Sequence, residues 1–269
     1  MIQPRRVRVR VRHLGSLSLT RMIPNIMTLL ALCAGMTAIR FAINGRFMSA
    51  VLAILVAAVL DGLDGRVARL LKTTSNLGAQ LDSLSDFICF GVAPAIILYI
   101  WTMSQLQAFG WVVVLLYGVC CALRLARFNT QLGAELPPYA YSFFTGIPSP
   151  AGAGLVLTPI YATLEWGGAF FRSPYLNAVV ILAVAALMVS RVPTYSFKRA
   201  RVPARYALPV LVLVGVLAAL MTTEPWGTMA LISLLYLATI PFSIRSYRRL
   251  RAHALRQQAE EAAKDSARA

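Results

Sequence analysis

The feature that most constrains this chain is a series of apolar stretches, each about as long as a bilayer is thick. A helix needs roughly 20 apolar residues to cross a hydrocarbon core of about 30 Å. The chain has 269 residues, of which 58% are hydrophobic and 13% are charged. Soluble domains have roughly 45 to 50% and 25% of these residues. We therefore expect an all-α fold, a polytopic membrane helical bundle.

About eight apolar stretches are candidate transmembrane helices. They cover residues 23–43, 47–60, 81–101, 109–125, 145–164, 175–189, 207–221 and 227–244. The second stretch is short because it continues into the polar segment 61–69. Short loops join the stretches, which predicts one membrane domain over residues 23–245. A basic juxtamembrane leader at 1–22 would precede it, and a cytoplasmic helical tail at 246–269 would follow it.

Lysine and arginine are distributed unevenly over the two sides of this topology. If the amino terminus is cytoplasmic, 23 of the 26 basic residues fall on the cytoplasmic side, and Arg40, Arg46 and Arg172 fall on the other. Cytoplasmic loops carry such an excess of basic residues, so we expect both termini in the cytoplasm. The net charge of +16 then requires no nucleic acid partner. The leader either binds anionic lipid headgroups or only sets the topology.

Neither cysteine nor histidine offers a reactive site. The four cysteines lie in or beside apolar stretches, without the spacing of metal ligands. His13 and His253 lie near the two termini in basic surroundings. Catalysis or metal binding must therefore depend on other side chains.

Aspartates are concentrated in one short segment. Four of the five aspartates, Asp61, Asp64, Asp82 and Asp86, lie within the 26 residues from Asp61 to Asp86. Each pair is three or four residues apart and so lies on one face of its own helix. Two such helices joined by a short loop can direct four carboxylates at one point, where they repel unless protonated or bound to metal. Oxygen-only ligands favour Mg²⁺ or Mn²⁺, and four carboxylates could hold two ions.

Two other interpretations of the carboxylates remain open at this point. Ionisable residues within membrane spans usually mark functional sites, which include the cation path of an ion-coupled transporter. The carboxylates could also pair structurally with Arg66 and Arg69. Transporters commonly contain repeated halves with broken helices, and no such repeat is evident in this sequence.

Small residues recur in the same segment, at Gly62, Gly65, Ala68 and Gly78. In membranes this spacing usually serves close helix packing. It could instead leave a slot for a flat base or a diphosphate, whose charge Arg69 and Lys72 would neutralise.

The whole segment resembles a known signature. Asp61-Gly62-x-x-Gly65-x-x-Ala68-Arg69, eight residues and Gly78-x-x-x-Asp82-x-x-x-Asp86 is similar to the motif of the CDP-alcohol phosphatidyltransferases, with Asp64 also in its expected place. The motif fixes nine residues over 26 positions. The resemblance implies transfer of a phosphatidyl group from a CDP-linked lipid to an alcohol, with release of CMP.

The resemblance also implies roles for individual residues. Asp61, Asp64 and Asp82 would bind one or two divalent ions, Mg²⁺ or Mn²⁺. Asp86 would be the general base for the acceptor hydroxyl and would also contact a metal, and we favour direct attack over a covalent intermediate. The CDP-lipid would be bound by the following residues: Asn25, Thr28, Gly62, Gly65, Ala68, Arg69 and Gly78. For Asn25 and Thr28, a helix cap and an interhelical hydrogen bond are equally good interpretations.

Two further motifs resemble the branch of this family that uses L-serine. They are Arg124-Leu-Ala-Arg127-Phe-Asn129 and Gly146-Ile-Pro148-Ser149-Pro150. The resemblance implies CDP-diacylglycerol and L-serine as substrates, with the acceptor bound by Arg124, Arg127, Asn129 and Pro148. A guanidinium suits the carboxylate of serine, although arginines at cytoplasmic helix ends also serve topology alone.

The acceptor, the oligomer and the location are further expectations. Other members of the family use glycerol 3-phosphate or inositol phosphate as the acceptor, and composition does not separate these from serine. We expect a homodimer, because small-residue faces favour helix association in membranes. We also expect a multi-pass protein of a bacterial cytoplasmic membrane, with its site facing the cytoplasm among membrane lipids.

Overall fold

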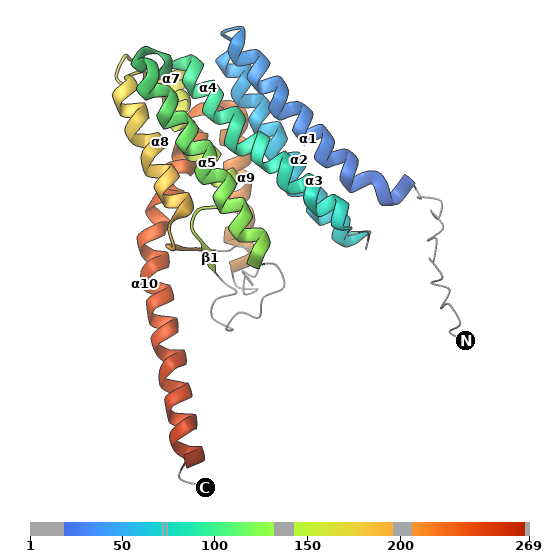
Figure 1. The fold of residues 1–269 in the computed structure, drawn as a ribbon, viewed down its shortest axis with the longest axis vertical. Helices are drawn as coiled ribbons and strands as arrows, with labels where there is room; N and C mark the ends of the chain where they lie inside the picture. Colours follow the sequence, from blue (N-terminus) through green and yellow to red (C-terminus); the bar gives the residue numbers. More distant parts are fainter. Residues whose placement is uncertain (1–18, 72, 74, 132–142, 196–205, 267–269) are drawn as a thin grey trace, which may run out of the picture.

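Helices that run along an elongated bundle make up nearly all of the structure (Figure 1). It is a computed structural model, and it describes residues 19–71, 73, 75–131, 143–195 and 206–266. The leader up to residue 18, Lys72 and the last three residues of the tail lie outside the described residues.

Five of the described helices are long and apolar enough to cross a membrane. They are α1 (Leu19–Ile43), α2 (Phe47–Leu70), the continuous helix Asn76–Trp101, α5 (Gln107–Gln131) and the first part of α10 (Pro225–Ser266). Two apolar helices are shorter, α8 (Pro174–Val189) and α9 (Ala207–Thr223). The expected membrane helical bundle is therefore confirmed. The count of about eight spans and the cytoplasmic placement of both termini remain predictions.

The stretch 145–164 is interrupted in the structure, although its composition predicts one span. It contains α6 (Ser149–Val156) and α7 (Thr158–Trp166), which meet at Leu157. Pro159 lies in the first turn of α7 and has no N–H to donate to the preceding turn. The break therefore follows from proline, which is tolerated in the first turn of a helix but not in its interior.

The helix Asn76–Trp101 changes its winding next to an aspartate. It begins as α3 (Asn76–Asp86), continues as the π-helical segment η1 (Phe87–Val92), and ends as α4 (Ala93–Trp101). Pro94 cannot donate to the carbonyl four residues earlier, that of Phe90. The hydroxyl of Tyr117 donates to Phe90 O instead, at 2.8 Å. Such π-segments occur often at functional sites, and this one begins directly after Asp86.

A small antiparallel sheet is the exception to the expected all-α fold. Strand β1 (Phe143–Thr145) pairs with β2 (Pro193–Tyr195), with Phe144 opposite Thr194. The hydroxyl of Ser243 on α10 donates to Pro193 O at 2.7 Å, which fastens the sheet to the helix. In Figure 1 the sheet, the end of α3 that follows α2 and the projecting half of α10 all lie toward the lower end of the bundle.

Gly146, directly after β1, shows why this turn requires glycine. Its φ is +76°, and a Cβ added there would lie 2.6 Å from Met188 O. Its N–H donates to Val192 O at 2.8 Å. Any other residue would be strained and would push against the end of α8.

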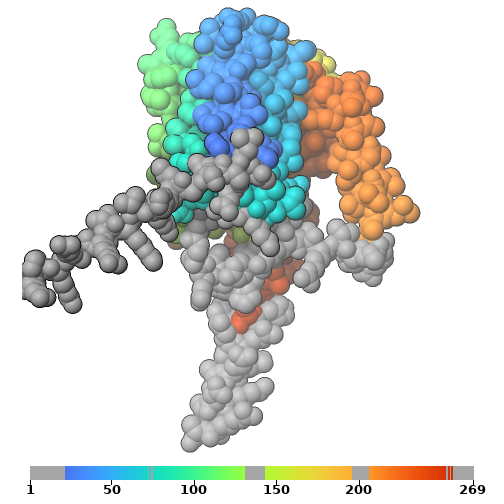
Figure 2. Space-filling view, turned by 90° about the vertical axis from the view of Figure 1, so that its right-hand side faces the viewer, coloured from blue at the N-terminus to red at the C-terminus, as the bar shows by residue number. Residues whose placement is uncertain are grey.

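Helix α9 lies at the edge of the bundle. It has no buried residue, and its exposed side chains are largely apolar. Figure 2 shows it as an orange column beside the blue helices α1 and α2. An apolar helix of this kind requires an apolar surrounding, which a bilayer provides.

Candidate functional site

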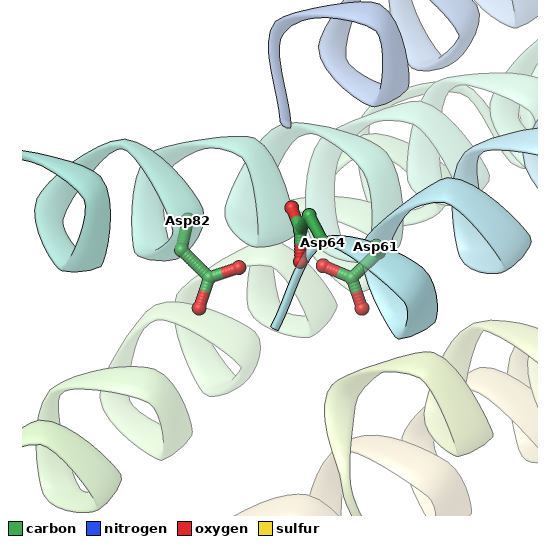
Figure 3. A group of neighbouring side chains, drawn as sticks. All are labelled: Asp61, Asp64 and Asp82. Carbon is green, nitrogen blue, oxygen red and sulfur yellow. The ribbon is translucent and has the colours of Figure 1, made fainter. Parts of the chain in front are cut away.

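Three of the four aspartates converge. Asp61 and Asp64 lie on α2, and Asp82 lies on α3. One carboxylate oxygen from each comes within 4.8 Å of the others, and Figure 3 shows the three side chains directed into a common space. The i, i+3 spacing on α2 and the turn back into α3 produce this arrangement.

The donor set suits a hard divalent cation. Two opposite oxygen ligands of Mg²⁺ are about 4.2 Å apart, because each lies about 2.1 Å from the ion. Oxygens within 4.8 Å of one another therefore need only a small shift to bind one ion. All three candidate ligands are carboxylates, and carboxylates bind hard ions such as Mg²⁺ and Mn²⁺ in preference to softer metals. The chemistry of the cluster thus fits a metal without selecting between these two.

Thr28 on α1 holds one of these carboxylates in place. Its hydroxyl lies 2.5 Å from Asp64 Oδ2, and both residues are only 4% exposed. The hydroxyl of Ser85 on α3 donates to Thr28 O at 3.2 Å. Hydrogen bonds at this threonine therefore join α1, α2 and α3. The sequence was compatible with either an interhelical hydrogen bond or a nucleotide contact for Thr28. The structure contains the interhelical hydrogen bond.

Asp86 lies one turn beyond Asp82 and outside the group of three. Its carboxyl group lies within hydrogen-bonding reach of that of Asp61. One of its oxygens, Oδ1, is buried and has no hydrogen-bond donor among the described residues. A buried acceptor in this state usually marks a missing partner, such as water, an ion or a ligand. This oxygen is thus available to a proton or a ligand.

A pocket of about 400 Å³ opens beside the aspartates, between α1, the end of α2 and the start of α3. Six of the seven predicted CDP-lipid residues line it, namely Asn25, Thr28, Gly65, Ala68, Arg69 and Gly78. Asp64 and Asp82 also line it, so the pocket and the candidate metal site are continuous. Gly62 is the predicted residue that does not line it.

The glycines of the motif have different surroundings. A Cβ added at Gly62 or Gly65 would meet nothing within 4 Å. A Cβ added at Gly78 would lie 2.9 Å from Asn25 Oδ1 and 3.2 Å from Ser75 Oγ. Gly78 therefore serves close packing of α3 against α1. Gly65 lines the pocket and leaves open space there, as expected of a slot for a ligand, whereas Gly62 is exposed outside the pocket.

Four residues line the pocket although the sequence motif did not predict them as site residues, namely Pro24, Thr73, Ser75 and Ala79. The hydroxyl of Thr73 is buried without a partner among the described residues. Ser75 is the N-cap of α3, and its hydroxyl accepts the N–H of Gly78 at 3.0 Å. Thr73 and Ser75 could have been predicted from the sequence as hydroxyl residues in the loop between the two halves of the motif. Loops commonly contain such residues for capping alone, however, so this signal is weak.

The two candidate arginines on α5 have different environments. Arg124 is 9% exposed, and one of its N–H groups donates to Ser149 Oγ at 3.1 Å. It lies close enough to Asp86 for charge attraction. Arg127 donates instead to Val189 O at 2.7 Å and Ser190 O at 3.4 Å, at the end of α8. Arg127 therefore acts as a cation that binds the last carbonyl groups of a helix. Of the two arginines, only Arg124 lies beside the aspartates.

The other two predicted acceptor residues have structural contacts. Asn129 Nδ2 donates to Ser83 Oγ at 2.9 Å and so ties α5 to α3. Pro148 precedes α6 as its N-cap residue, which places Ser149 at the first turn beside Arg124. Neither contact involves an aspartate.

The fold and the site together define a helical protein with membrane-capable apolar helices and an acidic cluster that could hold a divalent metal beside a pocket. A sequence profile of the CDP-alcohol phosphatidyltransferases matches residues 21–192, and that of CDP-alcohol phosphatidyltransferase 2 matches residues 205–241. The chain belongs to the CDP-alcohol phosphatidyltransferase family. The first match includes all four aspartates and both arginines of α5.

Several curated proteins are similar over most of the chain. A CDP-diacylglycerol--serine O-phosphatidyltransferase of Mycobacterium leprae is 42% identical over 234 residues, 87% of this chain and 78% of that protein. One of the same name from Helicobacter pylori is 36% identical over 219 residues, 80% of this chain and 87% of that protein. An archaetidylserine synthase of Methanothermobacter thermautotrophicus is 34% identical over 177 residues, 63% of this chain and 68% of that protein.

Proposed function

We propose that this protein transfers the phosphatidyl group of CDP-diacylglycerol to the hydroxyl of L-serine, giving phosphatidylserine and CMP. The names of its relatives support this reaction. The structural observation that carries it is the pair of Arg124 and Asp86. The buried guanidinium makes one hydrogen bond among the described residues and lies beside a carboxylate whose Oδ1 is buried without a donor there, which suits an acceptor with a carboxylate and a hydroxyl.

On the donor side, the 400 Å³ pocket would bind the cytidine diphosphate group. Arg69 would neutralise part of the diphosphate charge, and its Nε is already fixed by donating to Gly65 O at 2.9 Å. The open space over Gly65 would admit the nucleotide. Asp61, Asp64 and Asp82 would hold Mg²⁺ or Mn²⁺, as one ion or two. When bound, the metal supplies polarisation of the diphosphate and stabilisation of the leaving CMP.

On the acceptor side, Arg124 would bind the carboxylate of serine, and Asp86 would act as the general base. The serine hydroxyl would give its proton to Asp86 Oδ1 as its oxygen forms a bond to phosphorus. The phosphorus attacked is that of the phosphatidyl group. Its bond to the bridging oxygen would break, and the electron pair would leave with that oxygen on CMP. Asp86 suits this role because its Oδ1 is buried without a donor among the described residues and its carboxyl group adjoins that of Asp61, so it would also contact a metal.

We further propose the orientation and assembly that the sequence predicts. The site would face the cytoplasm, where CDP-lipid in the membrane meets soluble serine, in a bacterial cytoplasmic membrane. The bias of 23 of 26 basic residues toward that side supports this placement. A homodimer also remains part of the proposal.

The test is an acceptor panel. Purified protein in detergent with CDP-diacylglycerol and Mg²⁺ or Mn²⁺ would receive L-serine, glycerol 3-phosphate or inositol phosphate, with CMP release as the readout. Of the three acceptors, we expect only serine to support CMP release, and we expect no release when the metal is omitted. Turnover with either phosphorylated acceptor but not with serine would overturn the acceptor. Serine-independent cation flux in liposomes without CMP release would favour a transporter.

A further inference from the structure

One face of α10 is directed into the protein although the rest of the helix is largely exposed. Ser233, Tyr236, Ile240 and Ser243 recur at intervals of three and four residues, which places them on one side of the helix. Ser233, Ile240 and Ser243 are buried. This face packs against α6, α7 and β2. The side chain of Tyr236 therefore points toward the elements that surround Arg124, not toward lipid.

The three hydroxyl groups on this face are not equally satisfied. Ser233 donates to Met229 O at 2.9 Å, and Ser243 donates to Pro193 O at 2.7 Å. The hydroxyl oxygen of Tyr236 is buried and makes no hydrogen bond among the described residues. Buried hydroxyls are nearly always hydrogen-bonded, so this hydroxyl can serve as a donor to a ligand that reaches it.

Two neighbours of Tyr236 show what kind of partner would suit it. Thr194 lies within hydrogen-bonding reach of its hydroxyl, and because the Thr194 hydroxyl donates its proton to Gly146 O at 2.8 Å, it can act toward Tyr236 only as an acceptor. Arg124 also lies nearby, close enough to interact electrostatically. Among the described residues, one N–H of the Arg124 guanidinium donates to Ser149 Oγ. Its other N–H groups make no hydrogen bond among the described residues, and the guanidinium lies over the ring of Phe128, 5.5 Å from the ring centroid.

The start of α6 links the two donors. Ser149 is the hydrogen-bond partner of Arg124, and the next two residues, Pro150 and Ala151, line a cavity of about 250 Å³ together with Tyr236. Donors from α5 and α10 thus approach the first turn of α6 from two sides. A carboxylate has two oxygens and about four lone-pair sites, so it accepts from a guanidinium and a phenol at once.

We propose that Tyr236 is a specificity-determining residue of the acceptor subsite, where its hydroxyl donates a hydrogen bond to the carboxylate that Arg124 binds. The inference rests on the proposed function, because it assumes an acceptor with a carboxylate. Tyr236 would favour an amino acid over an amino alcohol of the same size. An uncharged donor would also add affinity without adding a second positive charge beside the metal site.

The test is Tyr236→Phe in the full chain, which removes only the hydroxyl. We expect the KM for serine to rise at least about tenfold, the scale of one hydrogen bond to a charged group. The kcat and the KM for CDP-diacylglycerol should stay near their wild-type values. Inhibition by L-alanine, which has the carboxylate but no hydroxyl, should weaken by the same factor as serine. Inhibition by ethanolamine, which lacks the carboxylate, should not change.

The matched control is Tyr195→Phe, which removes a hydroxyl that donates to Phe242 O of α10 at 3.3 Å. It should leave all of these constants unchanged. A wild-type KM for serine in Tyr236→Phe, or equal losses for alanine and ethanolamine, would overturn the inference alone. Failure of the wild-type protein to release CMP with serine would overturn the proposed function itself, so the two failures are distinguishable.

Discussion

Replacing Arg124 by lysine separates the geometry of its guanidinium from its charge. Lysine keeps the positive charge near Asp86 but presents a single ammonium in place of a planar fork. A serine carboxylate held by two parallel N–H groups would lose one of them. A hydrogen bond to a charged group contributes about 2 kcal/mol, which corresponds to a roughly 30-fold higher KM for serine.

Removing the side chain altogether should cost more. Arg124→Ala deletes both N–H groups, so we expect a loss of about 4 kcal/mol, or nearly 1,000-fold in kcat/KM for serine. It also removes the cation beside Asp86, so kcat should fall as well as KM rise. In both variants the KM for CDP-diacylglycerol should change little, because Arg124 does not line the pocket proposed for the nucleotide.

Arg127→Ala is the control from the same helix. Arg127 donates to Val189 O and Ser190 O, so we expect its loss to affect the end of α8 rather than the acceptor. We expect a loss of about 1 to 2 kcal/mol in the free energy of unfolding, with serine kinetics preserved. The assay is initial-rate CMP release over a range of serine concentrations, with melting temperatures measured in parallel. A larger rise in serine KM for Arg127→Ala than for Arg124→Lys would refute the division of roles.

Three further substitutions test separate parts of the site. Gly65→Ala should raise the KM for CDP-diacylglycerol yet stabilise α2 by about 0.5 to 1 kcal/mol, while Gly118→Ala, equally open on α5, should stabilise without affecting kinetics. Thr28→Val should raise the metal concentration for half-maximal activity at least about tenfold, the usual cost of losing a partner of a metal ligand; an unchanged requirement would exclude that role. Tyr117→Phe should cost about 1 to 3 kcal/mol of unfolding free energy by leaving Phe90 O unpaired, as thermal denaturation would show; equal stability would contradict this account of the π-segment.

Local spacing predicted the arrangement of the aspartates. Asp61 and Asp64 share a helix face because they are three residues apart, and the short turn into α3 leaves few positions for Asp82. Apolar length likewise predicted the membrane-capable helices. Both inferences use contacts within one helix or between helices joined by a short loop, which sequence spacing determines directly.

Features that depend on distant partners were less accessible. Arg124 and Arg127 are both basic residues at one helix end, and only the positions of α6 and α8 distinguish them. The π-segment requires Pro94 and also Tyr117 from another helix. The sheet pairs segments about fifty residues apart. Tyr236 is further still from the motif, and nothing in its local sequence marks it.

The most direct test of the account compares Asp86→Asn with Asp64→Asn in two assays, CMP release and equilibrium binding of CDP-diacylglycerol with Mg²⁺. Asp86→Asn removes the proposed base, so CMP release should fall by about 100- to 10,000-fold while binding persists. Asp64→Asn removes a proposed metal ligand, so both should be lost. Turnover near the wild-type rate in Asp86→Asn would contradict the assignment of the base. Undiminished metal-dependent binding in Asp64→Asn would contradict the metal site.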